Sequence, residues 1–276
     1  MTSLLPASVA LKKQSALYGL AARLITPIKA QTPDEWGAQH RVYPPSSGVP
    51  GPRNPSLTPY VIPVERAVAA GRFQRVVFVT AAQSGKTDLV LDVIGHKLDT
   101  RPVPILYVGP SKEFLTDQFE PRLMGLFDEA ATLSHKVVRG RSMKKTLKRV
   151  SGVPVRLAHA GSSTALKSDP AAFAAVDEYD EMMANIRGQG DPLGLVEARG
   201  VTYADFCALI TSTPSQGAKE TEKCSNTGLE FWKVLDPDEI NSPIWKLWQE
   251  GTRYHWAWPC KHCDEYFIPR FSLLTW

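Results

Sequence analysis

The sequence lacks several features that would define its class at once. Four cysteines among 276 residues are too few for a disulfide scaffold, so a reduced, cytosolic setting is the default. No apolar run approaches the ~18 residues that a membrane helix needs. Lys12 and Lys13 interrupt the apolar residues near the N-terminus, which argues against a secretory signal peptide. We therefore expect neither a secreted nor a membrane protein.

Charge of one sign is also not in large excess. Lysine and arginine total 32 against 28 acidic residues, which gives a net charge of +4. The hydrophobic share of 43% is ordinary for a globular protein and leaves room for one large or two modest domains. The mildly basic balance is compatible with nucleic acid binding but does not indicate it alone.

Glycine is absent between Gly71 and Gly85, and this gap covers the most informative stretch of the chain. The β-branched and aromatic residues 76–80 predict a buried strand, and an apolar helical pattern begins at residue 86. Between them lies a short loop that ends in Gly-Lys-Thr. Strand, loop and helix in this order indicate a phosphate-binding P-loop. The ATP-binding residues predicted from it are Ala82, Gln83, Ser84, Gly85, Lys86, Thr87 and Asp88.

Each type of P-loop residue has its own expected task. Backbone N–H groups and the helix N-terminus hold phosphate oxygens. Lys86 is predicted to reach the β- and γ-phosphates, and the Thr87 hydroxyl to bind Mg²⁺. The match is imperfect, because Thr80 stands where the usual pattern has its first glycine. A chance Gly-Lys-Thr at a helix start is the alternative interpretation.

A second motif supplies the carboxylates that ATP hydrolysis needs. Residues 171–176 are apolar and end in Asp177-Glu178, which predicts a buried strand with two acids at its end. Asp177 is expected to hold Mg²⁺, and Glu178 to act as the catalytic group that polarises the attacking water, together with Lys86. An apolar run before Asp-Glu is common, and its pairing with Gly-Lys-Thr makes it informative.

Other strand and helix patterns alternate with these motifs. Strands are expected at 105–110, 153–159 and 206–214, and a helix at 112–128. This alternation predicts an α/β fold of the P-loop NTPase type, with a mostly parallel sheet flanked by helices. The strand at 206–214 ends in hydroxyl residues that are candidates for γ-phosphate sensing, namely Thr211, Ser212 and Thr213.

Residues 136–150 are strongly basic and contain no acid. One interpretation is a solvated loop or hairpin. The other is a surface for phosphates, either of the DNA backbone or of ATP on a neighbouring subunit. The candidate DNA contacts or arginine fingers are Arg139, Arg141, Lys144, Lys145 and Lys148.

Three weaker signals leave alternatives open. Tyr60 is either an ordinary buried tyrosine or a stacking partner for adenine. Residues 1–31 form a helix that packs on its own domain or docks a partner, or they are disordered. Cys260 and Cys263 resemble one knuckle of a zinc ribbon, but the second Cys-x-x-Cys is missing, so a complete zinc site is not expected here.

The order of the motifs resembles the ATPase portion of the large terminase subunit of tailed bacteriophages, of the lambda-like type. The segments that carry this resemblance are Glu35-Trp36, Tyr43-Pro44-Pro45, Thr58-Pro59-Tyr60, Ala82–Thr87, Phe119-Glu-Pro-Arg-Leu123, Leu166-Lys-Ser168, Val176-Asp-Glu178, Ser212-Thr-Pro214 and Pro259–Cys263. Two positions depart from the pattern. Thr80-Ala81 replace an expected glycine, and Lys167 stands where arginine is expected.

The resemblance implies an ATP-driven motor with a helicase-like P-loop fold. Its relatives assemble as a ring on the portal of a procapsid, work with a small terminase subunit and drive double-stranded DNA inside. They act in the cytoplasm of the infected bacterial host and are not stable components of the virion. We expect a helical extension at 1–40, an ATPase core at 41–215 and a linker or subdomain at 216–276. The linker is expected to lead to a nuclease domain that is absent here.

Two other functions remain open from sequence. A helicase-like P-loop ATPase requires a second RecA-like domain, for which few residues remain after Pro214. A nucleotide-binding assembly module with little turnover is favoured by the missing glycine. The presence of Lys86, Asp177 and Glu178 argues against an assembly module with little turnover.

Overall fold

The computed structural model describes residues 18, 30–140, 143–167, 169–186, 188 and 190–273. The chain divides into two compact units, Met1–Gln31 and Thr32–Trp276. The helix predicted for 1–31 lies outside the described residues, apart from Tyr18 and the last two positions. The three-part division at residues 40 and 215 stays a prediction.

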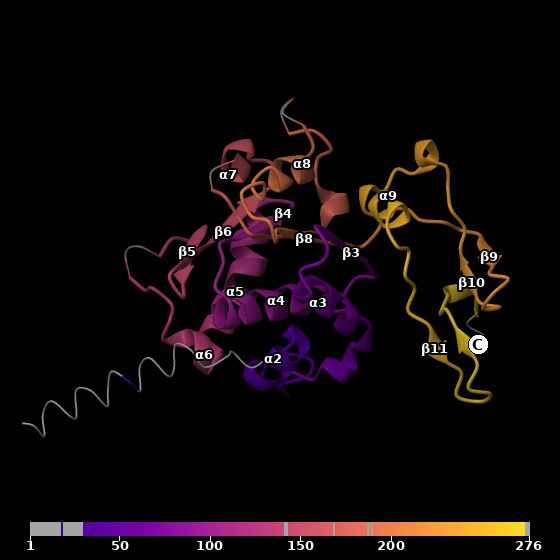
Figure 1. Cartoon of the computed structure of the whole chain (residues 1–276), viewed down its shortest axis with the longest axis horizontal. Coiled ribbons are helices and arrows are strands. Elements are labelled where there is room, and N and C mark those ends of the chain that lie inside the picture. The colour runs from indigo at the N-terminus through magenta and orange to yellow at the C-terminus, as the bar shows by residue number, and fades with distance from the viewer. Residues whose placement is uncertain are drawn as a thin grey trace, which may run out of the picture. The chain divides into compact units, whose positions relative to one another are not determined.

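A six-stranded sheet forms the centre of this unit (Figure 1). Its strand order is β3-β8-β7-β4-β6-β5, and every neighbouring pair is parallel except β5 with β6. In that order the strands are Arg75–Val79, Cys207–Ser212, Phe173–Asp177, Ile105–Gly109, Val153–His159 and Leu147–Val150. The sequence prediction of a mostly parallel sheet is therefore confirmed.

The register of the sheet brings the sequence motifs together. β8 lies between β3 and β7, with Val79 opposite Ser212 and Asp177 opposite Thr211. Parallel strands end at the same edge of a sheet, and ligands of open α/β folds bind outside that edge. The loop after β3 and the acids after β7 are therefore neighbours across the end of β8.

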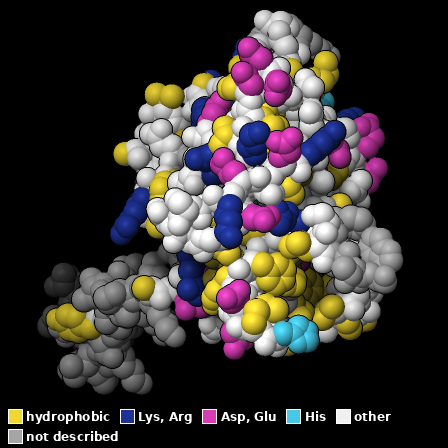
Figure 2. Space-filling view, turned by 90° about the vertical axis from the view of Figure 1, so that its right-hand side faces the viewer, with side chains coloured by type: hydrophobic (Ala, Val, Ile, Leu, Met, Phe, Trp, Pro, Cys, Tyr) yellow, Lys and Arg dark blue, Asp and Glu magenta, His cyan; other side chains and the backbone are white. Residues whose placement is uncertain are grey.

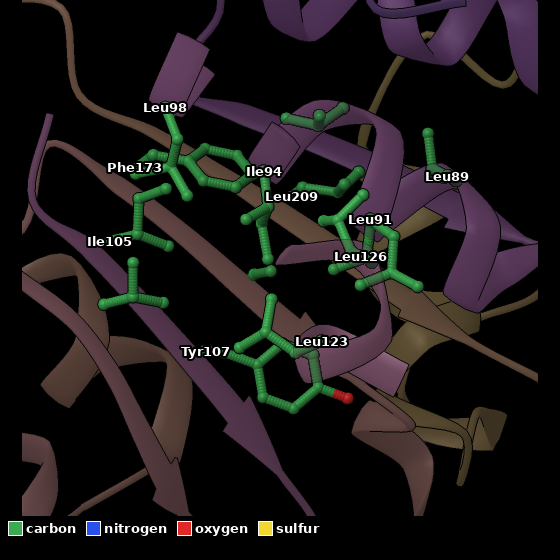
Figure 3. Packing of buried hydrophobic residues seen from close by; sticks show 14 of the residues in the cluster. Leu89, Leu91, Ile94, Leu98, Ile105, Tyr107, Leu123, Leu126, Phe173 and Leu209 are labelled. Carbon is green, nitrogen blue, oxygen red and sulfur yellow. The ribbon is translucent and has the colours of Figure 1, made fainter. Parts of the chain in front are cut away.

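Alternating side chains of the strands serve two separate cores, one on each face. On one face, Ile105, Tyr107 and Phe173 pack against apolar residues of α4 (Lys86–Thr100) and α5 (Glu120–Glu129), as Figure 3 shows. On the other face, Leu106 and Val108 pack with residues of α7 (Ser163–Lys167), α8 (Pro192–Glu197) and α9 (Pro243–Glu250). Helices on both faces explain why β4 and β7 are buried along their whole length.

Two short helices, α2 (Pro33–His40) and α3 (Ile62–Ala69), pack against α4. The fully buried Trp36 ring of α2 lies over Gly95 of α4, where a Cβ would stand 2.1 Å from the ring. Only glycine fits at this position. The Trp36 indole N–H also donates to Asp99 Oδ2 at 2.9 Å.

Two arginines before α3 hold the acidic face of the P-loop helix. Arg41 donates to Asp88 Oδ1 at 2.8 Å and to Asp92 Oδ1 at 2.5 Å. Arg53 donates to Asp92 Oδ2 at 3.1 Å. Asp92 is fully buried, so these arginines supply the charge that its burial requires. The segment between Arg41 and Arg53 is thus fixed to α4 at both of its ends.

The helix predicted at 112–128 is not uniform. A π-helix spans Phe114–Phe119 and α5 begins directly at Glu120, with Pro121 inside its first turn. A proline there cannot supply a backbone donor, which disturbs the regular hydrogen-bond ladder. Single π-helical turns of this kind are frequent at functional sites.

The C-terminal part consists of α9 and two small hairpins. β9 (Thr221–Lys223) pairs with β10 (Glu230–Trp232), and β11 (Trp258–Pro259) pairs with β12 (Tyr266–Phe267). Figure 2 views this side and shows hydrophobic side chains gathered on its surface. No helix among the described residues has the length and apolar character to cross a bilayer.

Candidate active site

The loop between β3 and α4 has the compact shape that a P-loop requires. Within residues 80–87, positive φ angles occur at Gln83 (+56°) and Gly85 (+88°). The hydroxyls of Thr80 and Ser84 are hydrogen-bonded at 2.8 Å, and Ser84 also donates to the carbonyl of Ala81. Thr80 has no positive φ, so its backbone does not need the glycine that the usual pattern carries there.

The N-terminus of α4 is suited to bind an anion. Gly85 is its N-cap and supplies no side-chain cap, so the first N–H groups of the helix are left for another acceptor. Thr58 lies against this point, because a Cβ on Gly85 would stand 3.3 Å from the Thr58 methyl carbon. The segment that carries Tyr60 is therefore next to the loop.

Lys86 joins the loop to both neighbouring strands. Its Nζ donates to Thr213 Oγ1 at 2.7 Å and to the Ala81 carbonyl at 3.3 Å, and it lies 3.4 Å from Glu178 Oε1. Only 7% of the side chain is exposed. A nearly buried ammonium at the end of three adjacent strands is available to a phosphate that displaces its present partners.

Asp177 is buried at the end of β7 and receives three hydrogen bonds. Thr211 Oγ1 donates to Oδ1 at 2.5 Å, the Glu178 N–H donates to Oδ1 at 3.1 Å, and Tyr107 OH donates to Oδ2 at 2.9 Å. Burial raises the pKa of Asp177, while the bonds from Thr211 and Tyr107 oppose this rise. A buried carboxylate of this kind is stabilised by a bound cation.

Glu178 turns sharply away from the strand. Its φ is +54°, and it starts the short helical turn Tyr179–Glu181. This backbone points the carboxylate back to the loop, where Oε1 faces Lys86 and Oε2 accepts from the Thr213 N–H at 3.4 Å. A left-handed conformation at a residue other than glycine is strained and typical of functional sites.

The three hydroxyl residues at the end of β8 have three different partners. Thr211 binds Asp177, and Thr213 binds Lys86. Ser212 Oγ accepts from the Asp180 N–H at 3.1 Å and donates to the Thr213 carbonyl. Thr213 is thus the member that touches the P-loop lysine directly, while the other two fix the acidic strand end.

Two residues near the site carry only a weak sequence signal. Tyr107 holds Asp177 from β4, although it stands 70 residues before it. Arg122 of α5 donates from Nη1 to Thr87 Oγ1 at 3.2 Å. The only hint for Tyr107 is a hydroxyl in an otherwise aliphatic strand, and the hint for Arg122 is its place in the Phe-Glu-Pro-Arg segment.

Asp180 also has a role that its sequence position does not reveal. Its carboxylate accepts from the Ser215 N–H at 2.8 Å, from the Ser242 hydroxyl at 2.5 Å and from the Ile244 N–H at 2.7 Å. It therefore ties the start of α9 to the strand end that carries Asp177.

The remaining predicted nucleotide contacts are placed as follows. Ala82 and Gln83 are exposed at the tip of the loop. Asp88 faces away toward Arg41, which engages its carboxylate. The Tyr60 ring is half-buried between Phe78, with ring centroids 6.5 Å apart, and Trp256 at 6.3 Å.

The basic segment divides into surface and buried side chains. Lys144 and Lys145 are exposed in the turn before β5, and Arg139 forms a surface ion pair with Asp128. Lys148 is 2% exposed and donates to Glu120 Oε1 at 2.5 Å, so it does not belong to the surface that sequence predicted. Arg141 lies outside the described residues.

Cys260 and Cys263 occupy the turn between β11 and β12, where the Asp264 N–H bonds the Cys260 carbonyl. This is a compact turn with two thiols. Across the part of the chain that the structure describes, no set of three or more His, Cys, Asp or Glu side chains is placed to hold a metal ion.

A phosphate-binding loop with a lysine, a buried aspartate and an adjacent glutamate on a parallel sheet define a P-loop ATPase. Residues 47–276 match the family model described as the phage terminase large subunit gpA, ATPase domain. The match spans most of the chain, and the protein belongs to this family. A comparison with curated proteins finds no match.

The solved structure of another large terminase agrees at the level of the fold. The large terminase of bacteriophage HK97 is 15% identical, with a TM-score of 0.53 over 67% of this chain and 38% of that one. The large terminase ATPase domain of Thermus phage P74-26 is 18% identical, with a TM-score of 0.42 over 56% of this chain and 65% of that one. The present chain thus spans well under half of the HK97 protein.

Proposed function

We propose that this chain is the ATP-hydrolysing motor domain of a terminase that moves double-stranded DNA into a procapsid. The family assignment supports this, and one observation carries it within the site. Lys86 contacts Thr213 and Glu178 at once, so the loop, the acidic strand end and the hydroxyl strand end meet at a single ammonium group.

The proposed roles follow from this geometry. The N–H groups of residues 82–88 and the Lys86 ammonium bind the phosphates of ATP. Incoming phosphate replaces Glu178 and Thr213 as partners of Lys86. The Glu178 carboxylate is then free to accept a proton from the attacking water. The Thr213 hydroxyl is released toward the terminal phosphate.

The donor set fits Mg²⁺. The Thr87 hydroxyl and the Asp177 carboxylate are hard oxygen ligands of the kind that Mg²⁺ takes beside nucleotide phosphates. Tyr107 and Thr211 hold the Asp177 oxygens in place. Bound there, Mg²⁺ offsets the charge that develops on the phosphate oxygens.

The partners belong to the same proposal. They are double-stranded DNA, the portal of the procapsid, a small terminase subunit and further copies of this chain in a ring. The exposed Lys144 and Lys145 and the surface arginine Arg139 are the proposed contacts to DNA or to a neighbouring active site. The proposed location is the cytoplasm of the infected host.

The test is ATP hydrolysis with DNA and procapsids present. A motor domain is expected to hydrolyse ATP faster by at least tenfold when both are added than when either is omitted. A rate that DNA and procapsids leave unchanged refutes the motor and favours an assembly module with little turnover. A rate that naked DNA alone raises fully favours a helicase-like ATPase.

A further inference from the structure

The first turn of α5 places an arginine beside the proposed metal ligand Thr87. Arg122 Nη1 donates to Thr87 Oγ1 at 3.2 Å, although the two residues are 35 positions apart. The Arg122 side chain is exposed, and its partner is a neutral hydroxyl instead of a carboxylate. The Arg122 guanidinium therefore contacts the Thr87 hydroxyl oxygen, which is also the proposed ligand of Mg²⁺.

The charge of Arg122 also reaches the acidic end of β7. Burial and the Asp177 carboxylate raise the pKa of Tyr107 well above its usual value, and the charge of Arg122 acts in the opposite direction. The Tyr107 hydroxyl is the group that donates to Asp177. Arg122 thus contacts Thr87, and its charge also acts on the hydroxyl that holds Asp177.

The backbone that presents Arg122 is fixed by Phe119 and Glu120, three and two positions before it. The Phe119 ring stacks on Tyr107 with centroids 3.4 Å apart and planes 6° apart. Glu120 accepts from the buried Lys148 at 2.5 Å. The start of α5 is therefore held rigidly against the site, while the exposed side chain of Arg122 can change partners.

We propose that Arg122 is a nucleotide-contacting residue, which binds Thr87 in the nucleotide-free protein and the terminal phosphate of ATP in the loaded protein. The inference rests on the proposed function of the site. A divalent cation held by Thr87 would repel the guanidinium, and the terminal phosphate of a nucleotide on this loop would offer it an anionic partner. Guanidinium groups bind phosphate oxygens through two parallel hydrogen bonds, which favours this exchange.

Arg41, Arg53 and Arg139 differ from Arg122 in that each is paired with a carboxylate. Arg41 is buried between Asp88 and Asp92, and Arg53 is buried on Asp92. Arg139 is paired with Asp128 at the surface. Their charges are already matched by carboxylates.

The experiment titrates Mg²⁺ with ADP or a non-hydrolysable ATP analogue into the wild-type chain and the Arg122→Ala variant. Arg101→Ala is the matched control, because Arg101 is exposed at the far end of α4, about 20 Å from Thr87 along the helix. Arg122→Ala is expected to weaken the ATP analogue about 10- to 100-fold. ADP affinity is expected to change less than about twofold, because ADP lacks the group that Arg122 contacts.

The outcomes separate this inference from the proposed function. Unchanged affinity of Arg122→Ala for both nucleotides, with binding lost in Lys86→Ala, overturns the role of Arg122 and leaves the site intact. Equal weakening of both nucleotides overturns the contact to the terminal phosphate. A wild-type chain that binds neither nucleotide contradicts both. Arg122→Lys, which keeps the charge but not the two parallel donors, is expected to recover only part of the affinity.

Discussion

Replacing Glu178 by glutamine is expected to separate ATP binding from ATP hydrolysis. Glutamine keeps the size of the side chain and an oxygen for the Thr213 N–H, but it cannot accept a proton from water. Loss of a general base lowers a rate by about 10²- to 10⁴-fold, which corresponds to about 3–5 kcal/mol of transition-state stabilisation. We expect hydrolysis by Glu178→Gln to fall by at least about a hundredfold.

The same variant is expected to bind ATP as well as the wild type or better. Lys86 is nearly buried and 3.4 Å from Glu178 Oε1, so it must leave this acid when it turns to phosphate. A partly exposed ion pair of this kind is worth about 0.2–1 kcal/mol. Removing the negative charge therefore strengthens ATP binding by at most about fivefold. This direction is opposite to that expected for a residue that holds the nucleotide.

Single-turnover hydrolysis and equilibrium binding of ATP measure the two effects separately. Glu181→Gln is the matched control, because Glu181 is an exposed acid three residues further along and is expected to keep wild-type rates. Hydrolysis by Glu178→Gln within about tenfold of the wild type would refute the assignment of the base. A tenfold loss of ATP affinity would refute the proposed exchange of partners at Lys86.

The other predictions concern the basic segment and a buried acid. Neutralising Lys144 and Lys145 is expected to lower the slope of log affinity for DNA against log salt by about 2. An unchanged slope would mean that these lysines belong to a solvated turn and do not contact DNA. Lys148→Ala is expected instead to lower the free energy of unfolding by about 3 kcal/mol in urea denaturation, because it leaves Glu120 unpaired. It is expected to leave the salt dependence of DNA binding unchanged. Burial and the charge of Asp92 raise the pKa of Glu65 to about 9, while Arg53 opposes this and Asp34 adds to it. The wild-type protein is therefore expected to lose stability as pH rises from about 4.5 to about 9, and the Glu65→Gln variant is expected to lose less. Equal losses of unfolding free energy in the two proteins over this pH range would contradict the assignment.

The sequence predicted the parts of the site that depend on neighbouring residues. A β-branched strand before Gly-Lys-Thr and an apolar strand before Asp-Glu are local patterns, and both elements were found at the expected residues. Their proximity followed from the parallel arrangement of the sheet. The backbone at Thr80 does not adopt a positive φ, so its conformation does not require the glycine of the usual pattern.

The partners of these residues were not predictable, because they come from distant elements. Tyr107 contacts Asp177 across 70 residues, and Arg122 contacts Thr87 across 35. Lys148 looked like one more surface charge in a basic run. Its burial depends on Glu120, whose position follows from the π-helix before α5. Pro121 disturbs the helix at this point, and the prediction of an uninterrupted helix at 112–128 did not take it into account.

The central claim is that Lys86 exchanges Glu178 and Thr213 for the phosphates of ATP. Calorimetric titration of Mg²⁺ and a non-hydrolysable ATP analogue into the wild-type chain and Lys86→Ala tests it most directly, with circular dichroism to establish that both are folded. The account predicts binding by the wild type and a loss of at least about a hundredfold in Lys86→Ala, because charged hydrogen bonds to phosphate are lost. Equal affinity of the two proteins would contradict it.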